Sequence, residues 1–275
     1  MRIGVDIGGT GIKAGIDNDG KIISFAERAT EAEKGRKKVL ENVRAAISEI
    51  IEDDVESIGI GCPGPFKDID AGLIGKQANL PLDNVNLVKE IESRFAIPVK
   101  INNDAKCFVL GEAIYGKGQN YNVVAGFTLG TGIGTGLVMD GKPYVGRGNS
   151  FEFGQSQFEG KTVEHFLGKK AIIRMAREKG VKIKETIELY ELARKGNRKA
   201  ISVWNGYGKL LGKAIASFID IVDPEVIYLG GNISGAYKLF KDSMNKEIEK
   251  KVFYKACKVE KSSLEHAGVI GAAYL

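Results

Sequence analysis

The chain has 275 residues, of which 43% are hydrophobic and 27% charged, and its formal net charge is +5. This length suffices for a large core in one large domain or two modest ones, and the composition is that of an ordinary globular protein. Lys and Arg are interspersed with Asp and Glu and no apolar run reaches membrane-spanning length, so we expect neither a nucleic-acid nor a membrane partner.

The cysteine and histidine content narrows the class further. The three cysteines are widely separated, at Cys62, Cys107 and Cys257, and only two histidines are present. This spacing predicts no disulfide framework, no CxxC metal pattern and no His-rich metal site. No signal peptide precedes the first predicted strand, and we therefore expect a cytoplasmic protein.

The first predicted element is a strand that ends in a glycine turn. Apolar residues alternate through residues 2–7 and lead into Asp6–Lys13, whose sequence is DIGGTGIK. Adjacent glycines allow the backbone to turn tightly and to approach a ligand. Thr10 can donate a hydroxyl hydrogen, Lys13 offers a positive charge, and Asp6 can hold a hydrated metal ion. The stretch suits a phosphate–Mg²⁺ site, although a plain hairpin turn has the same composition.

The next elements indicate an α/β fold. In chain order we predict a hairpin through residue 28, a helix over residues 33–52, a strand over 57–61, a helix over 87–95, a strand over 97–101 and a helix over 105–115. The rigid Cys62–Pro65 loop follows a strand, at the edge where open α/β sheets place ligands. Residues 66–86 lack periodicity, and a loop of that length is more often functional than idle.

Asp104 lies at the predicted junction between a strand and a helix, directly after Asn103. One interpretation is a helix N-cap, since Asn and Asp are both favoured there. The other is a general base that accepts a proton from a substrate hydroxyl during phosphoryl transfer. The residues themselves leave both open.

The second half of the chain repeats the plan of the first. A strand over residues 123–129 runs into the Gly/Thr-rich stretch 130–136, and a further strand and an Asp140-Gly141 turn follow. The first hairpin has the same order of strand, Gly/Thr turn, strand and Asp-Gly turn. An internal duplication of this kind predicts two related α/β halves, each offering one Gly/Thr hairpin to a shared cleft. The glycine run also resembles a dinucleotide fingerprint, but a strand follows where that motif requires a helix.

The remaining predicted elements are mostly helical. Residues 161–213 are mostly helical and rich in Lys and Glu, a further helix covers 210–221, and a buried strand over 226–229 precedes Gly230-Gly231. A short apolar helix over 267–275 ends the sequence. Glu152 and Glu164 flank an aromatic, glycine-rich segment, where carboxylates could accept hydrogen bonds from a polyol. Both could equally be surface glutamates.

Taken together, these motifs resemble the ROK family (repressors, uncharacterised reading frames and kinases), within the actin-like, sugar-kinase and Hsp70 ATPase superfamily. The similarity spans nearly the whole chain, and the joint occurrence of its motifs in order is specific. The matching segments are Asp6–Lys13, Gly61–Pro65, Ala78–Pro81, Asn102–Ala105, Gly111-Glu112, Thr128–Gly134 and Tyr228–Gly231.

The resemblance implies an ATP-dependent hexokinase built from two actin-like (ribonuclease H-like) α/β domains around a central cleft. The N-terminal domain would comprise residues 1–106 plus 264–275, and the C-terminal domain residues 107–263. Asp104 would be the catalytic base for the sugar 6-hydroxyl. The residues implied in sugar binding are Gly64, Asn79, Asn103, Asp104, Glu152, Gln155 and Glu164.

The same resemblance implies the nucleotide site and the oligomeric state. Asp6 would hold Mg²⁺ through water, Lys13 would lie near the transferred phosphate, and a homodimer is expected. The residues implied in ATP binding are Gly8, Gly9, Thr10, Lys13, Gly130, Thr131, Gly132, Gly230 and Gly231.

The sequence departs from the family at one segment. Gln155 stands where the family's GExGH segment has histidine, and Phe151 stands where it has glycine. The CxCGxxGC zinc cluster is absent, and Lys161-Thr162-Val163 stands where its last cysteine would fall. We therefore expect no structural zinc, because glutamine is a poor zinc ligand.

The acceptor and the phosphoryl donor stay open at this stage. A glucose-like hexose is the leading acceptor, with N-acetylmannosamine, N-acetylglucosamine, mannose or fructose as alternatives, and the donor could be ATP, another nucleotide or polyphosphate. A sugar-responsive repressor would require a DNA-binding module before the first hairpin, whereas the first strand begins at Arg2. A degenerate sugar-binding or regulatory protein is disfavoured by the intact Asp6, Thr10, Asp104 and Thr131.

Overall fold

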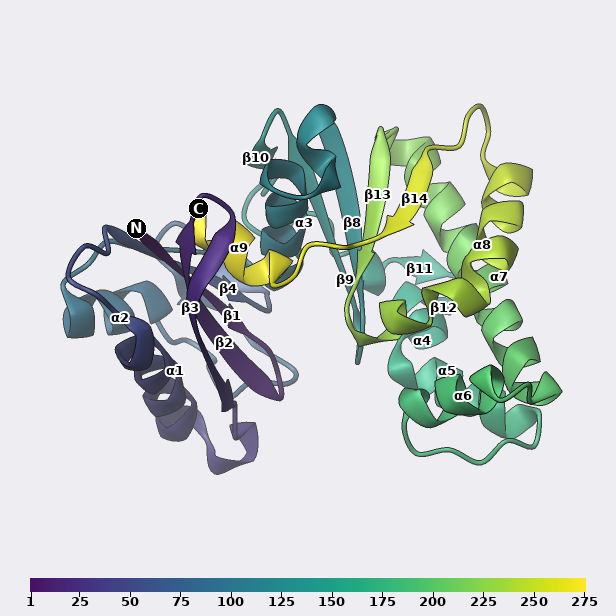
Figure 1. Cartoon of the computed structure of the whole chain (residues 1–275), viewed down its shortest axis with the longest axis horizontal. Coiled ribbons are helices and arrows are strands. Elements are labelled where there is room, and N and C mark those ends of the chain that lie inside the picture. Colours follow the sequence, from purple (N-terminus) through teal and green to yellow (C-terminus); the bar gives the residue numbers. More distant parts are fainter. The chain divides into compact units, whose positions relative to one another are not determined.

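The computed structural model describes residues 1–275 and contains two five-stranded sheets with helices around them (Figure 1). The chain forms two compact units. Unit 1 comprises residues 1–126, 136–151 and 263–275, and unit 2 comprises residues 127–135 and 152–262. No helix combines the length and the apolar character needed to cross a membrane.

The first part of the chain forms the elements of the first sheet and its surrounding helices. In order they are β1 (Arg2–Ile7), β2 (Gly11–Asn18), β3 (Lys21–Ala29), η1 (Ala32–Lys34), α1 (Arg36–Ile50), β4 (Ser57–Cys62), β5 (Phe66–Asp68), β6 (Leu73–Ile74), α2 (Leu87–Phe95), β7 (Val99–Asn103), α3 (Asp104–Ile114) and η2 (Lys117–Asn120).

The rest of the chain forms the second sheet, most of the helices and the C-terminal helix. In order they are β8 (Val123–Leu129), β9 (Ile133–Met139), β10 (Lys142–Pro143), η3 (Phe153–Gln155), β11 (Gln157–Phe158), β12 (Lys161–Thr162), α4 (Val163–Leu167), α5 (Lys169–Glu178), α6 (Thr186–Arg194), α7 (Arg198–Val222), β13 (Val226–Gly230), η4 (Asn232–Ala236), α8 (Tyr237–Lys251), β14 (Lys258–Lys261) and α9 (Ala267–Ala273).

The first sheet has the strand order β3-β2-β1-β4-β7. β1, β2 and β3 are antiparallel neighbours, whereas β1, β4 and β7 run parallel. The register places Asp6 beside Gly61, and Gly61 beside Asn102. The carboxyl ends of the three parallel strands therefore meet at one edge, which is where α/β sheets bind ligands.

The alternation of residues along β1 determines what covers each face of this sheet. Ile3, Val5 and Ile7 are fully buried in the core that α1 covers. Gly4 points to the other face, where a Cβ atom would lie 1.8 Å from the Val269 carbonyl oxygen. Helix α9, drawn in yellow in Figure 1, therefore packs directly against the strand backbone.

The second sheet repeats the plan of the first, with the order β10-β9-β8-β13-β14. In both sheets a three-strand meander is followed, on the side of its first strand, by two later strands. The last two pairs correspond as well, because β4–β7 and β13–β14 are both parallel. The repeat predicted from the two Gly/Thr hairpins therefore extends to the strand order of the two sheets.

Several element boundaries differ from those predicted. Helix α1 covers Arg36–Ile50 rather than 33–52, because Gly35 has a φ of 86° and separates it from η1. Strand β7 covers Val99–Asn103 rather than 97–101, since Asn103 pairs with Cys62. The segment predicted as an irregular loop contains the short pair β5–β6. The helix predicted over 210–221 is the second half of α7, which begins at Arg198.

Candidate active site

The first Gly/Thr hairpin forms a tight turn between β1 and β2. The Gly8 N–H donates to the Gly11 carbonyl at 2.8 Å. Thr30, fully buried directly after β3, donates its hydroxyl hydrogen to the Gly8 carbonyl at 2.7 Å and its N–H to the Thr10 carbonyl at 3.1 Å. The residue that follows the third strand therefore holds the turn in place by two hydrogen bonds. Sequence reasoning missed Thr30, because a Thr at a strand end gives no local signal of this contact.

Asp6 and Lys13 are cross-strand partners on either side of this turn. Burial raises the pKa of Asp6 to about 6, and the Lys13 ammonium acts in the opposite direction. A single half-buried carboxylate of this kind fits a hydrated Mg²⁺ held through water, since Mg²⁺ usually keeps several waters and takes few protein ligands. No cluster of three or more His, Cys, Asp or Glu residues offers a cage for a metal ion.

Asp104 is the first residue of α3, and Asn103 is the N-cap. The Asn103 Oδ1 accepts from the N–H groups of Ala105 and Lys106, at 2.9 and 3.3 Å. The interpretation of Asp104 as the helix N-cap is therefore wrong, because Asn103 occupies the N-cap position. Because Asn103 Oδ1 is committed to the helix, its Nδ2 group is the part that can donate to a ligand.

The pKa of the Asp104 carboxyl group lies well above its ordinary value. Burial, and secondarily the nearby Asp6 carboxylate, raise its pKa to about 7, against the opposing hydrogen bond from the Ala105 N–H at 2.9 Å. A carboxyl group with a pKa near neutrality is well matched to exchange a proton with a substrate. The placement of Asp104 at the carboxyl edge of the sheet brings it into the same region as Asp6.

The loop that carries Asn79 is braced by one hydrogen bond within itself and by bonds to two other segments. Gln77 donates its side-chain amide to the Pro63 carbonyl, and its N–H to Asp83 Oδ1 at 2.8 Å. Arg36 at the start of α1 donates to the Asp83 carbonyl at 2.7 Å. The segment containing Asn79 is thereby tied both to the Cys62–Pro65 loop and to α1.

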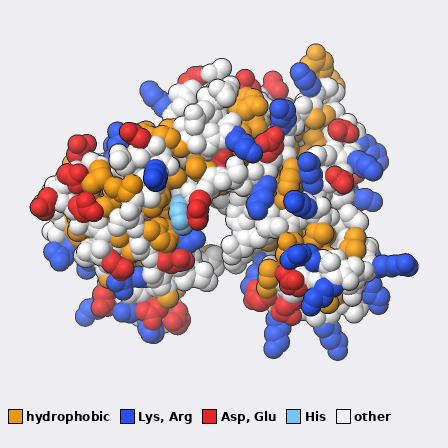
Figure 2. Space-filling model, viewed as in Figure 1, with side chains coloured by type: hydrophobic (Ala, Val, Ile, Leu, Met, Phe, Trp, Pro, Cys, Tyr) orange, Lys and Arg blue, Asp and Glu red, His pale blue; other side chains and the backbone are white.

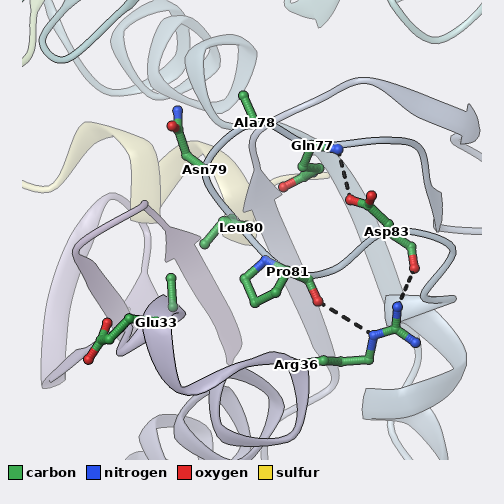
Figure 3. Close-up of a pocket in the computed structure, with 9 residues that line it drawn as sticks. Glu33, Arg36, Gln77, Ala78, Asn79, Leu80, Pro81 and Asp83 are labelled. Carbon is green, nitrogen blue, oxygen red and sulfur yellow. Dashed lines mark hydrogen bonds between the residues drawn. The ribbon is translucent and has the colours of Figure 1, made fainter.

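A cavity of about 840 Å³ opens beside this braced loop (Figure 3). Asn79 lines it, and its side chain points away from Arg36 on the opposite side (Figure 3). Asn79 also lies next to the first glycine turn, since a Cβ atom on Gly9 would be 3.7 Å from the Asn79 Cβ. Unit 1 thus brings together the turn, Asp6, Asp104 and Asn79, and Gly64 lies in the loop that Gln77 holds.

Unit 2 contains the second Gly/Thr turn. The Gly130 N–H donates to the Gly132 carbonyl at 3.0 Å, and the Lys169 N–H at the start of α5 donates to the Gly130 carbonyl at 3.0 Å. Glu164 Oε2 accepts from the Ile133 N–H at 3.1 Å. A Cβ atom on Gly132 would be 2.1 Å from that carboxylate oxygen, so a larger residue there would displace the Glu164 carboxylate.

Two further residues of unit 2 that the resemblance implies in sugar binding, Glu152 and Gln155, flank Gly154, which packs near this turn. Glu152 precedes η3 and Gln155 ends it, and both are exposed. Gly154 between them packs against the segment after the turn, since its Cβ would be 2.4 Å from the Ile133 carbonyl oxygen. The structure therefore places Glu152, Gln155 and Glu164 around the start of β9.

The Gly230-Gly231 turn follows β13. Gly231 has a φ of 78°, and a Cβ there would be 2.4 Å from the Leu129 carbonyl oxygen, so this position requires glycine. Beside it lies a cavity of about 480 Å³, lined by Ile187 and Tyr190 of α6, Trp204 of α7, and Asn232 and Ile233 of η4. Its size and apolar walls are typical of a small-molecule site.

Two sheets of the same strand order, each with a glycine turn after its first strand, define an actin-like two-domain α/β fold. A carboxyl group whose pKa lies near 7, at the edge of one sheet, suits a phosphotransferase with an alcohol acceptor. The comparisons agree. The ROK family model matches residues 2–275, and the chain therefore belongs to the ROK family.

Individual relatives show the same class. A glucokinase from Thermotoga maritima is 31% identical, over 98% of this chain and 95% of the relative. An N-acetyl-D-glucosamine kinase from Haemophilus influenzae is 28% identical, over 85% of this chain and 84% of the relative. The crystal structure of a ROK family glucokinase from Streptomyces griseus, in complex with glucose and AMPPNP, superposes with a TM-score of 0.87 at 27% identity, over 99% of this chain and 98% of that one.

Proposed function

We propose that this protein is an ATP-dependent sugar kinase that transfers the γ-phosphoryl group to the 6-hydroxyl of a glucose-like hexose, with Asp104 as the general base. The observation that carries the proposal is the Asp104 carboxylate, whose pKa burial raises to about 7 at the edge of the sheet that also bears the first glycine turn. The glucokinase relatives support a glucose-like acceptor. N-acetylglucosamine, N-acetylmannosamine, mannose and fructose are the competing acceptors.

In the proposed reaction Asp104 accepts the proton of the 6-hydroxyl as the sugar oxygen forms a bond to the γ-phosphorus. The bond between the γ-phosphorus and the β–γ bridging oxygen breaks, and ADP leaves with its electron pair. Such transfers depend mainly on positioning and charge stabilisation. The Gly8 and Gly130 N–H groups close the two turns, so the N–H groups of Gly9 and Thr10, and of Thr131 and Gly132, are the ones that suit phosphate oxygens. The Lys13 ammonium suits the transferred group.

Asp6 would hold Mg²⁺ through water. When bound, this ion would neutralise charge on the β- and γ-phosphates. The cavity after Gly230-Gly231 is the proposed pocket for the adenine ring of ATP. Ile187, Tyr190 and Trp204 provide apolar surface there for a planar ring. On the acceptor side, Gly64, Asn79, Asn103, Glu152, Gln155 and Glu164 are the proposed sugar contacts.

The experiment is a panel of hexoses, amino sugars and N-acyl sugars with ATP and Mg²⁺, scored by ADP formation and by mass of the sugar product. We expect a 6-phosphorylated hexose, and Asp104→Asn should abolish turnover while sugar binding persists. Asp53→Asn, an exposed carboxylate after α1, is the matched control and should retain activity. Full activity of Asp104→Asn would remove Asp104 from its role, and no product with any sugar would refute the kinase assignment.

We also propose a homodimer. Two aromatic side chains on the loop between α8 and β14, Phe253 and Tyr254, are 93% and 91% exposed, and Ile221 at the end of α7 is 80% exposed. Exposed apolar groups of this size favour a protein contact. Figure 2 shows hydrophobic side chains projecting where Figure 1 draws that loop, on a face where charges of both signs are otherwise interspersed. Sedimentation velocity at micromolar concentration tests this, and a monomer would contradict it.

A further inference from the structure

The segment that leads from β10 to Phe151 is bound to a part of unit 1 far from it in sequence. Asn149 Oδ1 accepts from the Phe66 N–H at 2.7 Å, and Asn149 Nδ2 donates to the Phe66 carbonyl at 2.8 Å. A side-chain amide thus pairs with a backbone residue as a neighbouring strand would. Phe66 begins β5 and directly follows Gly64 and Pro65.

Two further contacts fix the same segment. Lys106 of α3, only 1% exposed, donates its ammonium to the Gly148 carbonyl at 3.4 Å. Gly148 has a φ of 110°, and a Cβ there would be 3.3 Å from Cγ2 of Ile69, just beyond β5. The segment therefore packs against the Gly64–Ile69 region, and α3, which begins with Asp104, contacts it as well.

This segment ends where the chain passes from unit 1 to unit 2. Phe151 is the last residue of its stretch of unit 1, and the chain enters unit 2 at Glu152. Asn149 therefore holds the chain in place three residues before it enters unit 2 at Glu152. On the other side it holds the backbone two residues after Gly64. Both Gly64 and Glu152 are among the proposed sugar contacts.

We propose that Asn149 is a positioning residue for sugar binding, which fixes the Gly64 loop relative to the segment that ends in Glu152. This inference rests on the proposed sugar kinase activity. It assigns to Asn149 no contact with substrate. Its contribution is to hold backbone groups in the geometry that the sugar requires, so its loss should weaken sugar binding and leave the nucleotide side unaffected.

The test is Asn149→Ala, which removes both hydrogen bonds from an exposed side chain and leaves the fold intact. We expect KM for the sugar to rise about tenfold or more, as expected for two lost hydrogen bonds, with KM for ATP unchanged within about twofold. The matched control is Ser150→Ala. Its hydroxyl donates only to the Tyr144 carbonyl inside the same segment, so both KM values should stay at the wild-type level.

Amide hydrogen exchange separates this inference from the proposed function. Because the Phe66 N–H donates to Asn149, its exchange should accelerate at least about fivefold in Asn149→Ala and remain unchanged in Ser150→Ala. An unchanged sugar KM, or an equal rise of both KM values, overturns the positioning role. If the wild type phosphorylates no sugar, the kinase assignment fails, and unaltered exchange at Phe66 would independently refute the contact on which Asn149 acts.

Discussion

Asp104 has an electrostatic cost that its proposed role explains. Burial and the Asp6 carboxylate both disfavour its ionised form, and its pKa rises from the ordinary value of 3.8 to about 7. The folded state therefore binds a proton more tightly than the unfolded chain between these two pH values. Stability contributed by the protonated group falls as pH rises through this window, and above it the folded protein carries the full cost of the ionised carboxylate.

This cost predicts that Asp104→Asn stabilises the protein while abolishing its activity. At about pH 8 without Mg²⁺, the free energy of unfolding of the variant should exceed that of the wild type by roughly 2–4 kcal/mol. This figure uses about 1.36 kcal/mol per unit of pKa shift, with allowance for partial exposure of the side chain. Thermal unfolding near pH 8 and near pH 5 measures it, and the gain should be smaller at the lower pH. A variant no more stable than wild type at pH 8 would contradict the buried-carboxylate interpretation.

The site residues differ in how far the sequence could predict them. Asp104 could be located because a strand followed by Asn-Asn-Asp and a helix marks a sheet edge. Its N-cap neighbour could not be distinguished from it, since Asn and Asp cap helices equally well. Thr30 and Asn149 act through hydrogen bonds to distant backbone groups, at Gly8 and Phe66, and no local pattern reports such contacts.

At the scale of elements, α9 is held in unit 1 by glycines rather than by large side chains. A Cβ atom on Gly59 would lie 1.7 Å from the Ala272 carbonyl oxygen, and one on Gly271 would lie 1.8 Å from the Cys107 carbonyl oxygen. The helix therefore contacts the backbones of β4 and α3 directly. The apolar composition of residues 267–275 predicted a buried helix, but the glycine contacts on which its depth depends involve residues far apart in sequence.

We predict that Gly59→Ala destabilises unit 1 by about 3 kcal/mol or more, because the added methyl group overlaps backbone atoms that cannot rotate away. Urea unfolding should show a lower midpoint. The control is Gly11→Ala, also in the first sheet, where the nearest atoms to a Cβ would be 3.8 Å away and the midpoint should hold. An unchanged midpoint for Gly59→Ala would show that α9 can shift without cost.

Element boundaries were predictable where packing and local signals agree. The predicted helix over 87–95 coincides with α2, whose Asn86 cap accepts from the Lys89 N–H at 2.9 Å and whose apolar face is buried. The short β5–β6 pair was missed because three and two residues are too few to show a period. Such strands exist through their partners rather than through their own sequence.

For the whole molecule, the residues proposed to act in catalysis and in substrate binding come from both units. Asp6, the first glycine turn and Asp104 belong to unit 1, whereas Thr131, Glu164 and Gly231 belong to unit 2. Unit 1 contains the proposed general base, whereas unit 2 contains the glycine turn beside the proposed nucleobase pocket. The proposed reaction therefore depends on residues of each unit, and exclusion of bulk water from the substrates would favour the sugar hydroxyl as acceptor.

This division predicts that sugar controls the reactivity of ATP. Without sugar, ATP hydrolysis should be slow, because the γ-phosphate and the catalytic groups are ordered for transfer only when the sugar site is filled. A 6-deoxy hexose fills the sugar site but lacks the nucleophile, so a single water can occupy the place of the missing hydroxyl. Phosphoryl transfer to that water should then be about tenfold faster than without sugar, and the 6-deoxy sugar itself should not be phosphorylated. ADP release with ATP–Mg²⁺, with and without the 6-deoxy sugar, measures this. Equal ADP release in both cases would contradict substrate-driven assembly, and a phosphorylated 6-deoxy product would show that a hydroxyl other than the 6-hydroxyl is the acceptor.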